Sequence, residues 1–405
     1  MPTLSRSMFR VGRVASDLLR RLSLFPALAR RDATPTVTTS KSAHADRLSH
    51  QDCLSRLVYK FWIPCRLISI AHATTRCLDT QNVVTEVDKE LIYCKPRMDR
   101  VYLVPVIKNS SHRDGAIYKN KFMREDFWEG DIADRNETQL EPMMFSKATE
   151  KCLPVAGNCW LHFQKEMLQF FSVQLSKTLI STGPIQLYGY IAARDLRDGM
   201  LNYVVNYSRD HPVIVQQGSL IEMTGPKRGI EMSSIVLIEF DMRIKNGMHE
   251  EEDQQLIDGA ISYYDRHSGY PPIRHRICGN YGAVDISLGI VEQAVEATIE
   301  VFISEVTSGF SLCLSSFVDV MNDYEEIQLF HGTIVHTGAL RRFVVAVSWD
   351  TMMLLKFKAG SEGCIDSRQI KLQAKKHGCA SRHIEFKVAA ISVKVTWPTP
   401  SVFHH

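Results

Sequence analysis

Residues 234–245 constrain the fold of this chain more than any other stretch of its sequence. From position 236 onward every second side chain is apolar (Val236, Ile238, Phe240, Met242, Ile244), and charged side chains stand at 239, 241, 243 and 245. A repeat of two residues is typical of a β-strand with one buried and one solvated face. Burial of each apolar side chain contributes about 1.5–3 kcal/mol, whereas ordering each backbone residue costs about 1–2 kcal/mol. The strand therefore needs neighbouring strands and a second layer over its apolar face.

The same alternation recurs from residue 284 onward, and strand-forming side chains between turn residues mark further strands before it. The predicted strands cover residues 167–175, 185–194, 203–206, 256–264, 284–290, 295–303, 343–349 and 353–357, with a longer last strand over 384–397. Turn residues such as Asp198-Gly199 and Asn246-Gly247 separate several of them. No long segment follows the 3.6-residue repeat of a helix. The predicted fold class is therefore all-β, as an antiparallel β-sandwich or an open barrel.

Three details of connectivity follow from the turn signals and the register. Residues 284–290 and 295–303 are interpreted as a hairpin that turns near residues 292–294. Residues 343–349 are expected to pair with 353–357 across Asp350-Thr351. In the last strand the apolar positions change from even to odd at Ala389-Ala390, which predicts a bulge or a corner between sheets.

The 405 residues divide by composition into three parts. Residues 1–85 form a basic extension rich in Arg and Ser, with no Glu before Glu86. Residues 86–140 are mixed and polar, and they are interpreted as a linker with little structure. Residues 141–397 hold the predicted strands, and a single domain of about 250 residues is within the usual range for a sandwich.

The extension has two readings that composition leaves open. Its apolar side chains recur at helical spacing between arginines, at Met8, Val11, Ala15, Leu18 and Leu22. An Arg-rich, acid-poor amphipathic start fits an organelle transit peptide, and a disordered basic arm has the same composition. The expected location is the mitochondrion or chloroplast in the first case and the cytoplasm in the second.

Charge and hydropathy limit the classes of partner. The net charge is +3, but the first 60 residues hold 11 Lys and Arg against 4 Asp, so the remainder is slightly acidic. A slightly acidic body is a poor match for nucleic acid, and we expect a protein partner instead. No run of about 20 apolar residues predicts a membrane span. Ten cysteines without a Cys-x-x-Cys pair indicate neither a zinc knuckle nor a disulfide scaffold.

Three groups of side chains are of the types that bind metals, but their spacing in the sequence does not match that of known metal sites. The run His-Glu-Glu-Glu-Asp at 249–253 lacks the calcium-loop pattern and is interpreted as a solvated loop. His331 and His336 are five residues apart, which places them on opposite faces of a strand. The third group is Cys364, His377, Cys379 and His383. Its spacing matches no common zinc pattern, so no metal or cofactor site is predicted.

Signals for catalysis and anion binding are equally weak. The Gly-x-Ser-x-Gly motif is missing, and no cysteine lies in a motif that lowers its pKa. The turn Gly-Pro-Lys-Arg-Gly at 225–229 precedes a strand, so it lacks the helix N-terminus that holds a phosphate, and its basic side chains are expected in solvent. The other basic clusters are residues 274–276 and Lys371, Lys375, Lys376 and Arg382. Without interleaved exposed aromatics they predict no nucleic-acid groove, and no catalytic residue is assigned.

Five blocks of sequence stand out in order along the chain. They are LYGYIAARD at 187–195, NYVVN at 202–206, SLIEMTGPKRG at 219–229, EFDMRIK at 239–245 and QLIDG at 255–259. Together they resemble a family of plant proteins, abundant in grasses and defined by a domain of unknown function, over roughly residues 141–397. Some such relatives accompany a ribosome-inactivating rRNA N-glycosidase domain, whose helix carries a Glu and, three residues later, an Arg. Neither Glu296 nor Glu300 nor any neighbouring glutamate has that Arg, so the resemblance implies no catalytic residue here.

The sequence therefore favours a non-enzymatic β-rich module for interaction or structure, in a stress or defence setting. Two alternatives stay open. One is an N-glycosidase-type hydrolase with unidentified carboxylates. The other is a carbohydrate-binding sandwich that would use Trp349, Trp397, Tyr188 and Tyr190 as stacking platforms, although the strand register of these aromatics favours the core.

Overall fold

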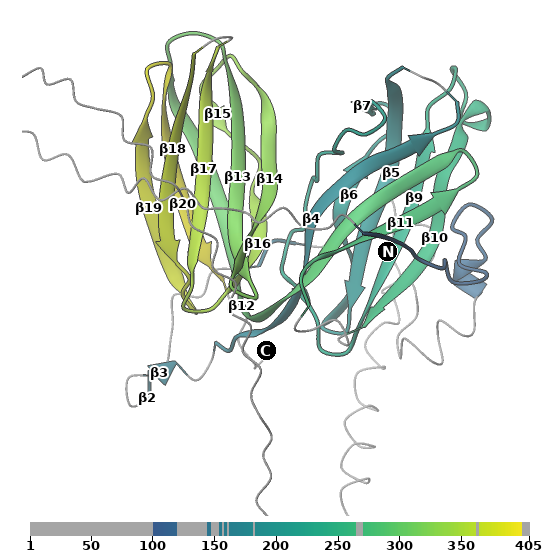
Figure 1. Cartoon of the computed structure of the whole chain (residues 1–405), viewed down its shortest axis with the longest axis horizontal. Helices are drawn as coiled ribbons and strands as arrows, with labels where there is room; N and C mark the ends of the chain where they lie inside the picture. The colour runs from purple at the N-terminus through teal and green to yellow at the C-terminus, as the bar shows by residue number, and fades with distance from the viewer. Residues whose placement is uncertain are drawn as a thin grey trace, which may run out of the picture. The chain divides into compact units, whose positions relative to one another are not determined.

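The computed structural model describes residues 100–119, 144–146, 154–155, 158–159, 162–180, 183–264, 270–361 and 364–398. All of them belong to one unit of the chain, residues 86–405. Their regular structure is β-strand apart from two 3-10 turns, η1 (Ile117–Lys119) and η2 (Glu250–Glu252), which confirms the all-β prediction (Figure 1). The described residues contain no helix with the length and hydrophobicity that a bilayer-crossing helix needs.

One long strand, β12 (Gly282–Val306), organises the largest sheet. Its first half pairs with β4 (Lys165–Thr178) and β11 (Ile273–Gly279), and its second half pairs with β16 (Phe343–Ser348) and β20 (Ala389–Trp397). The nine-stranded sheet is completed by β1 (Val101–Leu103), β8 (Ile230–Glu231), β15 (Gly338–Ala339) and β19 (Gly378–Glu385). β12 therefore belongs to both halves of this sheet.

Two smaller sheets pack one on each half of the large sheet (Figure 1). The first has the order β10 (Gln254–Tyr264), β9 (Ile235–Ile244), β5 (Ile185–Asp195), β6 (Asp198–Tyr207), with β7 (Val213–Val215) on β5. The second has the order β14 (Asp323–Ile334), β13 (Phe310–Val320), β17 (Met352–Ser361), β18 (Cys364–Gln373). A separate short pair consists of β2 (Pro154–Val155) and β3 (Asn158–Cys159). The fold is thus two β-sandwiches that share β12, where the sequence predicted one.

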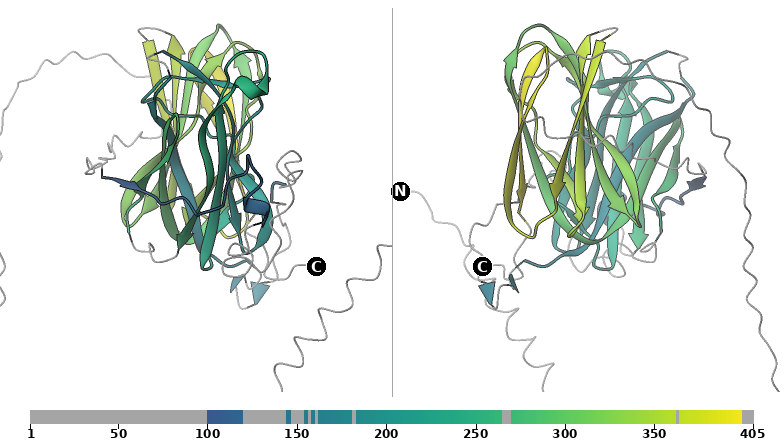
Figure 2. Two further views of the ribbon diagram at one scale, coloured as in Figure 1. Left: turned by 90° about the vertical axis from the view of Figure 1, so that its right-hand side faces the viewer. Right: turned by 60° about the vertical axis from the view of Figure 1, so that its left-hand side comes forward.

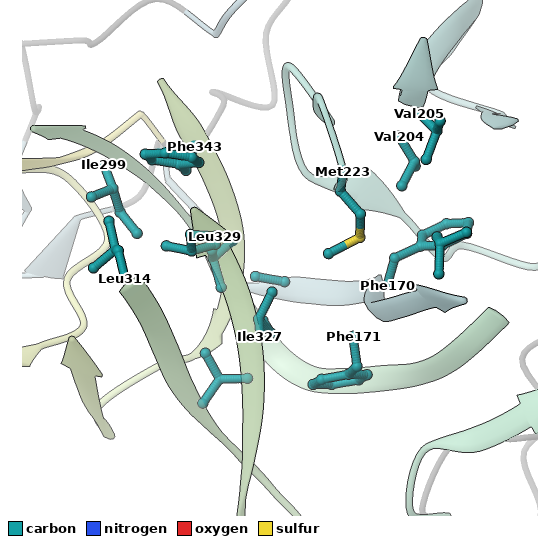
Figure 3. Close-up of a cluster of buried hydrophobic side chains, with 14 of the residues drawn as sticks. Phe170, Phe171, Val204, Val205, Met223, Ile299, Leu314, Ile327, Leu329 and Phe343 are labelled. Carbon is teal, nitrogen blue, oxygen red and sulfur yellow. The ribbon is translucent and has the colours of Figure 1, made fainter. Parts of the chain in front are cut away.

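The core continues from one sandwich into the other. A single cluster of buried apolar side chains includes Phe170 and Met223 of the first half and Leu314 and Phe343 of the second. In the close-up of Figure 3, Ile327 and Leu329 of β14 lie between these two groups. Because one apolar cluster extends through both halves, the two sandwiches bury a common apolar surface.

The strand β9 matches the organising stretch of the sequence. It is paired on both edges, with β10 and with β5. Its five alternate apolar side chains, from Val236 to Ile244, are all buried as predicted. The neighbouring predictions for β4, β5 and β10 are also confirmed. β6 is longer than predicted, because Asp198 and Gly199, expected in a turn, are its first residues.

The predicted hairpin over residues 284–303 is wrong, because these residues form the continuous strand β12. Gln293 has a positive φ of 47°, and the pairing with β4 shifts register between Val291 and Ala294. The residues expected in a turn therefore form an irregularity inside one strand. Alternation of apolar residues is the same on both sides of a bulge and of a turn, so periodicity could not distinguish them.

Two further connections differ from the prediction. β16 pairs with β12, and β17 pairs with β13 and β18, so the expected pairing across Asp350-Thr351 is wrong. The turn there, with Asp350 at a φ of 63°, carries the chain from the large sheet to the small one. The predicted long last strand is in fact the hairpin β19–β20, closed by the Phe386 N–H donating to the Ala389 carbonyl at 2.8 Å. The change from even to odd register marks this reversal of the chain.

Residues 100–119 are a correction to the linker interpretation of 86–140. β1 pairs in parallel with β11, and the residues after it contact β10. Polar composition concealed this, because only Val101–Ile107 is apolar and Pro105 interrupts it. The extension 1–85 and the rest of the linker prediction lie outside the described residues.

Candidate binding site

Residues 101–119, here called the strap, connect the edge of the large sheet to the edge of the first small sheet. The Val104 N–H donates to the Arg276 carbonyl of β11 at 3.2 Å, and the Ile107 N–H donates to the Ala260 carbonyl of β10 at 2.9 Å. Figure 2 shows this segment in dark blue across the strands of the first sandwich. The strap therefore closes part of the open side of that sandwich.

Two consecutive side chains fasten the strap to β10. Ser110 Oγ accepts the Ala260 N–H at 2.9 Å and donates to the Ile107 carbonyl at 2.7 Å. Ser111 Oγ donates to Asp258, which also accepts the backbone N–H of His112 at 2.8 Å. On an edge strand, side-chain hydroxyl groups of this kind provide hydrogen bonds that a neighbouring strand would otherwise provide.

His112 anchors the strap electrostatically. Its Nε2 lies 3.0 Å from Glu239 Oε2 on β9, and its Nδ1 lies 3.2 Å from Asp258 Oδ1 on β10. Burial by itself lowers the pKa of His112, but its hydrogen bonds to Asp258 and Glu239 outweigh burial and raise that pKa to about 9. The imidazole is therefore a cation at neutral pH, held between two carboxylates.

Glu239 holds a second cation on its other oxygen. Arg194 Nε of β5 donates to Glu239 Oε1 at 2.7 Å, and both side chains are buried. Burial raises the pKa of Glu239, but the charge of Arg194 and the His112 hydrogen bond outweigh it and lower that pKa to about 2. Glu239 was expected on the solvated face of its strand, and this is wrong because the strap covers that face. The charge alternation of β9 gave no sign of such a cover.

A groove of about 570 Å³ lies between the strap and the two sheet edges. One wall is residues 102–105 of the strap, and the other is residues 261–263 of β10, with Tyr270, Ile273 and His275 also lining it. The strap must be in place for the groove to have its first wall.

Apolar and aromatic side chains form the rim and the base of the groove. On its rim Leu103 is 74% exposed, Tyr270 is 58% exposed and Tyr102 is 49% exposed. Tyr263 and His275 are buried at its base, with ring centroids 5.7 Å apart at 84°. Large exposed aromatics beside a concave surface are typical of a binding site rather than of an ordinary solvated edge.

The β10 edge presents backbone groups to this groove. Both the N–H and the carbonyl of Ala260 point away from β9, since Ser110 and Ile107 of the strap bind them. Backbone direction repeats every two residues along an unshifted antiparallel pair, so the N–H and carbonyl of Ser262 point the same way. The described residues supply no partner for them, and Pro105, which also lines the groove, has no N–H to donate. The site therefore combines apolar walls with an open strand edge.

The turn at 225–229 is not solvated as predicted. Arg228 is buried, and its Nη1 and Nη2 each donate to one oxygen of Asp195 at 2.6 Å. The Gly229 N–H donates to the buried carboxylate of Glu296 at 2.9 Å. A bidentate pair of this type fixes the turn against β5 and leaves Arg228 unable to present its charge to a partner.

The other basic and acidic clusters are also partly turned inward. Arg276 makes a bidentate pair with Asp285 at 2.7 and 2.8 Å, and His275 of the same cluster faces the groove. In the run 249–253, Asp253 is buried and accepts from the Tyr188 hydroxyl at 2.6 Å and from Arg209 Nε at 2.7 Å. This acidic loop thus supports the end of the first sandwich.

The side chains with metal-ligand chemistry and the aromatic side chains considered as stacking platforms lie outside the groove. No group of three or more His, Cys, Asp or Glu side chains within the described ranges is arranged to hold a metal ion. Tyr188, Tyr190 and Trp397 are buried, as their register indicated, and so they cannot act as platforms. Trp349 is partly exposed beneath the Lys376 ammonium, which lies 4.7 Å from its ring centroid.

Comparison with known proteins identifies a family but no function. Residues 167–396 match the model of a family described as a domain of unknown function, DUF6598. No curated protein matches the chain. Among solved structures, human GIVD cytosolic phospholipase A2 shares 9% identity over 58% of this chain and 30% of that chain, with a TM-score of 0.21. A structure of two C2 domains of Extended-Synaptotagmin 2 shares 7% identity over 63% of this chain and 97% of that chain, with a TM-score of 0.22. This chain spans about a third of the length of the phospholipase, and likenesses at these TM-scores carry no argument.

Proposed function

This chain belongs to the DUF6598 family of domains of unknown function, and on that premise we propose its function from the geometry of the groove. The protein is a non-enzymatic binding module that accepts an extended, apolar segment of a partner protein. The segment lies along β10 in the groove between the strap and the two sheet edges. In this position it adds a strand to the first small sheet.

The observation that supports this proposal is the outward direction of the Ser262 backbone. Two residues before Ser262 on β10, the strap already makes this kind of contact, because the Ile107 N–H donates to the Ala260 carbonyl. A partner strand continues that pattern by bonding to the N–H and carbonyl of Ser262. Main-chain hydrogen bonds supply affinity in strand addition, and pockets for alternate side chains supply specificity. Here the walls for those side chains are Leu103, Tyr270 and Ile273.

The lining of the groove fits a peptide better than a sugar. Its described lining side chains contain no carboxylate, side-chain amide, lysine or arginine. A sugar ring exposes many hydroxyls, and a site that buries them needs matching polar groups. An extended apolar peptide needs only the strand edge and the aromatic walls. The same lack of a carboxylate leaves the groove without the acid that an N-glycosidase-type hydrolase needs.

Selection from a phage-displayed library of short linear peptides tests the proposal. We expect enriched peptides with apolar residues at alternate positions. Ser262→Pro removes the outward N–H of an edge strand and should weaken their binding about tenfold, since a hydrogen bond and its geometry are lost. Ser262→Ala keeps the N–H and is the matched control, which should bind as the unchanged protein does. Fluorescence anisotropy with a labelled selected peptide measures both.

A second pair of variants guards against a loss of folding. Leu103→Asp places a charge on the exposed rim of the groove and should also weaken binding about tenfold or more. Ile365→Asp makes the same type of change at an exposed position of β18 and should have no effect. Peptide binding that survives both Ser262→Pro and Leu103→Asp would place the site elsewhere. Base release from ribosomes by the purified protein would replace this proposal with the hydrolase alternative.

A further inference from the structure

A second groove, of about 660 Å³, lies on the second sandwich. Its surface is built on the second half of β12 and on β20 and β19, with the residues around β15 as one side. It shares no lining residue with the groove at β10. Its chemistry is also different, because charged side chains surround it.

The strand register places polar side chains in a row across this groove. Glu300 of β12 pairs with Lys394 of β20, and Lys394 pairs with Ser381 of β19. The next outward row starts at Phe302, which pairs with Ser392. Residues that are directly paired on adjacent strands lie about 5 Å apart, so these side chains form one continuous surface.

Positive charge exceeds negative charge in this groove. Glu300 is its single lining carboxylate, and it is shared by Arg342 Nε at 2.9 Å and Lys394 Nζ at 3.5 Å. Arg382 adds a third cation, and its hydrogen bond recorded in the structure goes to the Ser381 carbonyl at 2.9 Å. One carboxylate therefore faces three cations.

An apolar surface accompanies this charge. Phe302 is 49% exposed within the groove, and Leu340 lines it beside Phe302. An inorganic anion would use the cations and leave the phenyl ring in water. A ligand with carboxylates next to an apolar side chain uses both features.

We propose that this groove binds an acidic peptide segment that carries an apolar side chain beside its carboxylates. Arg342, Lys394 and Arg382 hold the carboxylates, and Phe302 contacts the apolar side chain. A flat anionic bilayer does not reach the base of a concave groove, so a peptide fits this surface better than a membrane. Glu300 acts here as an internal competitor for two of the three cations.

The role of Glu300 gives the proposal a distinctive test. A labelled peptide of alternating Glu and Leu residues serves as the probe, and fluorescence anisotropy is measured with the whole protein at low salt. Glu300→Gln frees both cations and should tighten binding about two- to fivefold, a gain that a purely structural role would not produce. Arg382→Glu reverses one ligand-binding charge and should weaken binding about tenfold or more. Raising the salt concentration should weaken binding of every variant.

Charge-matched controls separate this site from general attraction. Lys358 is an exposed residue of β17, in the opposite sheet of the second sandwich. Lys358→Glu makes the same charge change as Arg382→Glu and should leave binding unchanged. A peptide of alternating Gln and Leu can bind only at the groove at β10, so Arg382→Glu and Glu300→Gln should leave its affinity unchanged. Equal losses for Lys358→Glu and Arg382→Glu would overturn the proposal, as would weaker binding by Glu300→Gln. Binding to phosphatidylserine vesicles through Arg382, with no binding to the peptide, would also overturn it. None of these outcomes involves Ser262, so they do not affect the groove at β10.

Discussion

At the scale of single residues, one histidine controls whether the strap is held in place. His112 is buried between Glu239 and Asp258, and the pair Arg194–Glu239 continues the network into β5. Removal of one member of a buried charged network leaves its partners uncompensated, which typically costs about 3–5 kcal/mol. The sequence showed these residues only as members of alternating strands and of a polar stretch. Their meeting depends on a contact between positions more than 100 residues apart, which local pattern does not contain.

The raised pKa of His112 predicts a dependence of stability on pH. Its folded pKa of about 9 lies above the ordinary value of 6.5, so its contribution is complete below about pH 6.5 and is lost as the pH rises through 9. Glu239, with its pKa lowered to about 2, stays charged throughout this range. We expect His112→Gln to lower the free energy of unfolding by about 3 kcal/mol at pH 6 and by much less at pH 10. Urea unfolding at both pH values measures this.

A control for that measurement is available on another strand. His331 is exposed on β14, and His331→Gln should leave the same pH profile as the unchanged protein. A difference between His112→Gln and the unchanged protein that is the same at pH 6 and pH 10 would contradict the assigned charge of His112.

At the scale of elements, the strands were predictable and their connections were not. Alternation of apolar residues identified β9, because burial on one face imposes that repeat, whereas β4, β5 and β10 were predicted from strand-forming side chains between turn residues. The same repeat continues across the irregularity at Gln293, so it could not show that β12 is one strand. The strap was missed because a three-residue strand and hydroxyl anchors leave almost no pattern. The binding site was missed with it, since the strap forms one of its walls.

A glycine in β10 is expected to set the position of the strap. Gly259 has a φ of +137°, and a Cβ there would lie 2.5 Å from Val106 Cγ1 and 2.9 Å from Ser110 Oγ. Gly259→Ala should therefore displace the strap and lower the free energy of unfolding by about 1–3 kcal/mol. Gly218→Ala is the matched control, because Gly218 has a φ of +85° with no atom within 4 Å of its Cβ position. Faster amide exchange of Ile107 in Gly259→Ala alone confirms the prediction, and equal rates in both variants would contradict it.

At the scale of the whole described unit, the shared strand and the common core couple the two sandwiches. β12 pairs within both, and one apolar cluster extends through both. Such a unit is expected to unfold in a single cooperative transition. Composition and length could not predict this, because one large sandwich and two fused ones bury similar side chains.

A core substitution in the second sandwich tests this coupling. Leu314→Ala removes a fully buried side chain of β13 and should lower the free energy of unfolding by about 2–5 kcal/mol. The transition should shift equally for a fluorophore attached at Leu103 of the first sandwich and for one at Ile365 of the second. A shift seen only at Ile365 would show that the two halves unfold independently.

The N-terminal extension carries a separate proposal. We propose that residues 1–85 act as an organelle transit peptide, since they are rich in Arg and Ser and contain no Glu. A fluorescent reporter fused behind these residues should collect in mitochondria or chloroplasts of plant cells. A diffuse cytosolic signal would support the disordered arm instead.

The central claim is that a partner strand joins the sheet at Ser262, and amide hydrogen exchange of that residue tests it most directly. Addition of a selected peptide should slow exchange of the Ser262 N–H at least about tenfold, because the open edge gains a hydrogen-bond partner. Exposed amides of the second sandwich should keep their rates. Unchanged exchange at Ser262 under conditions that saturate the peptide site would contradict the account.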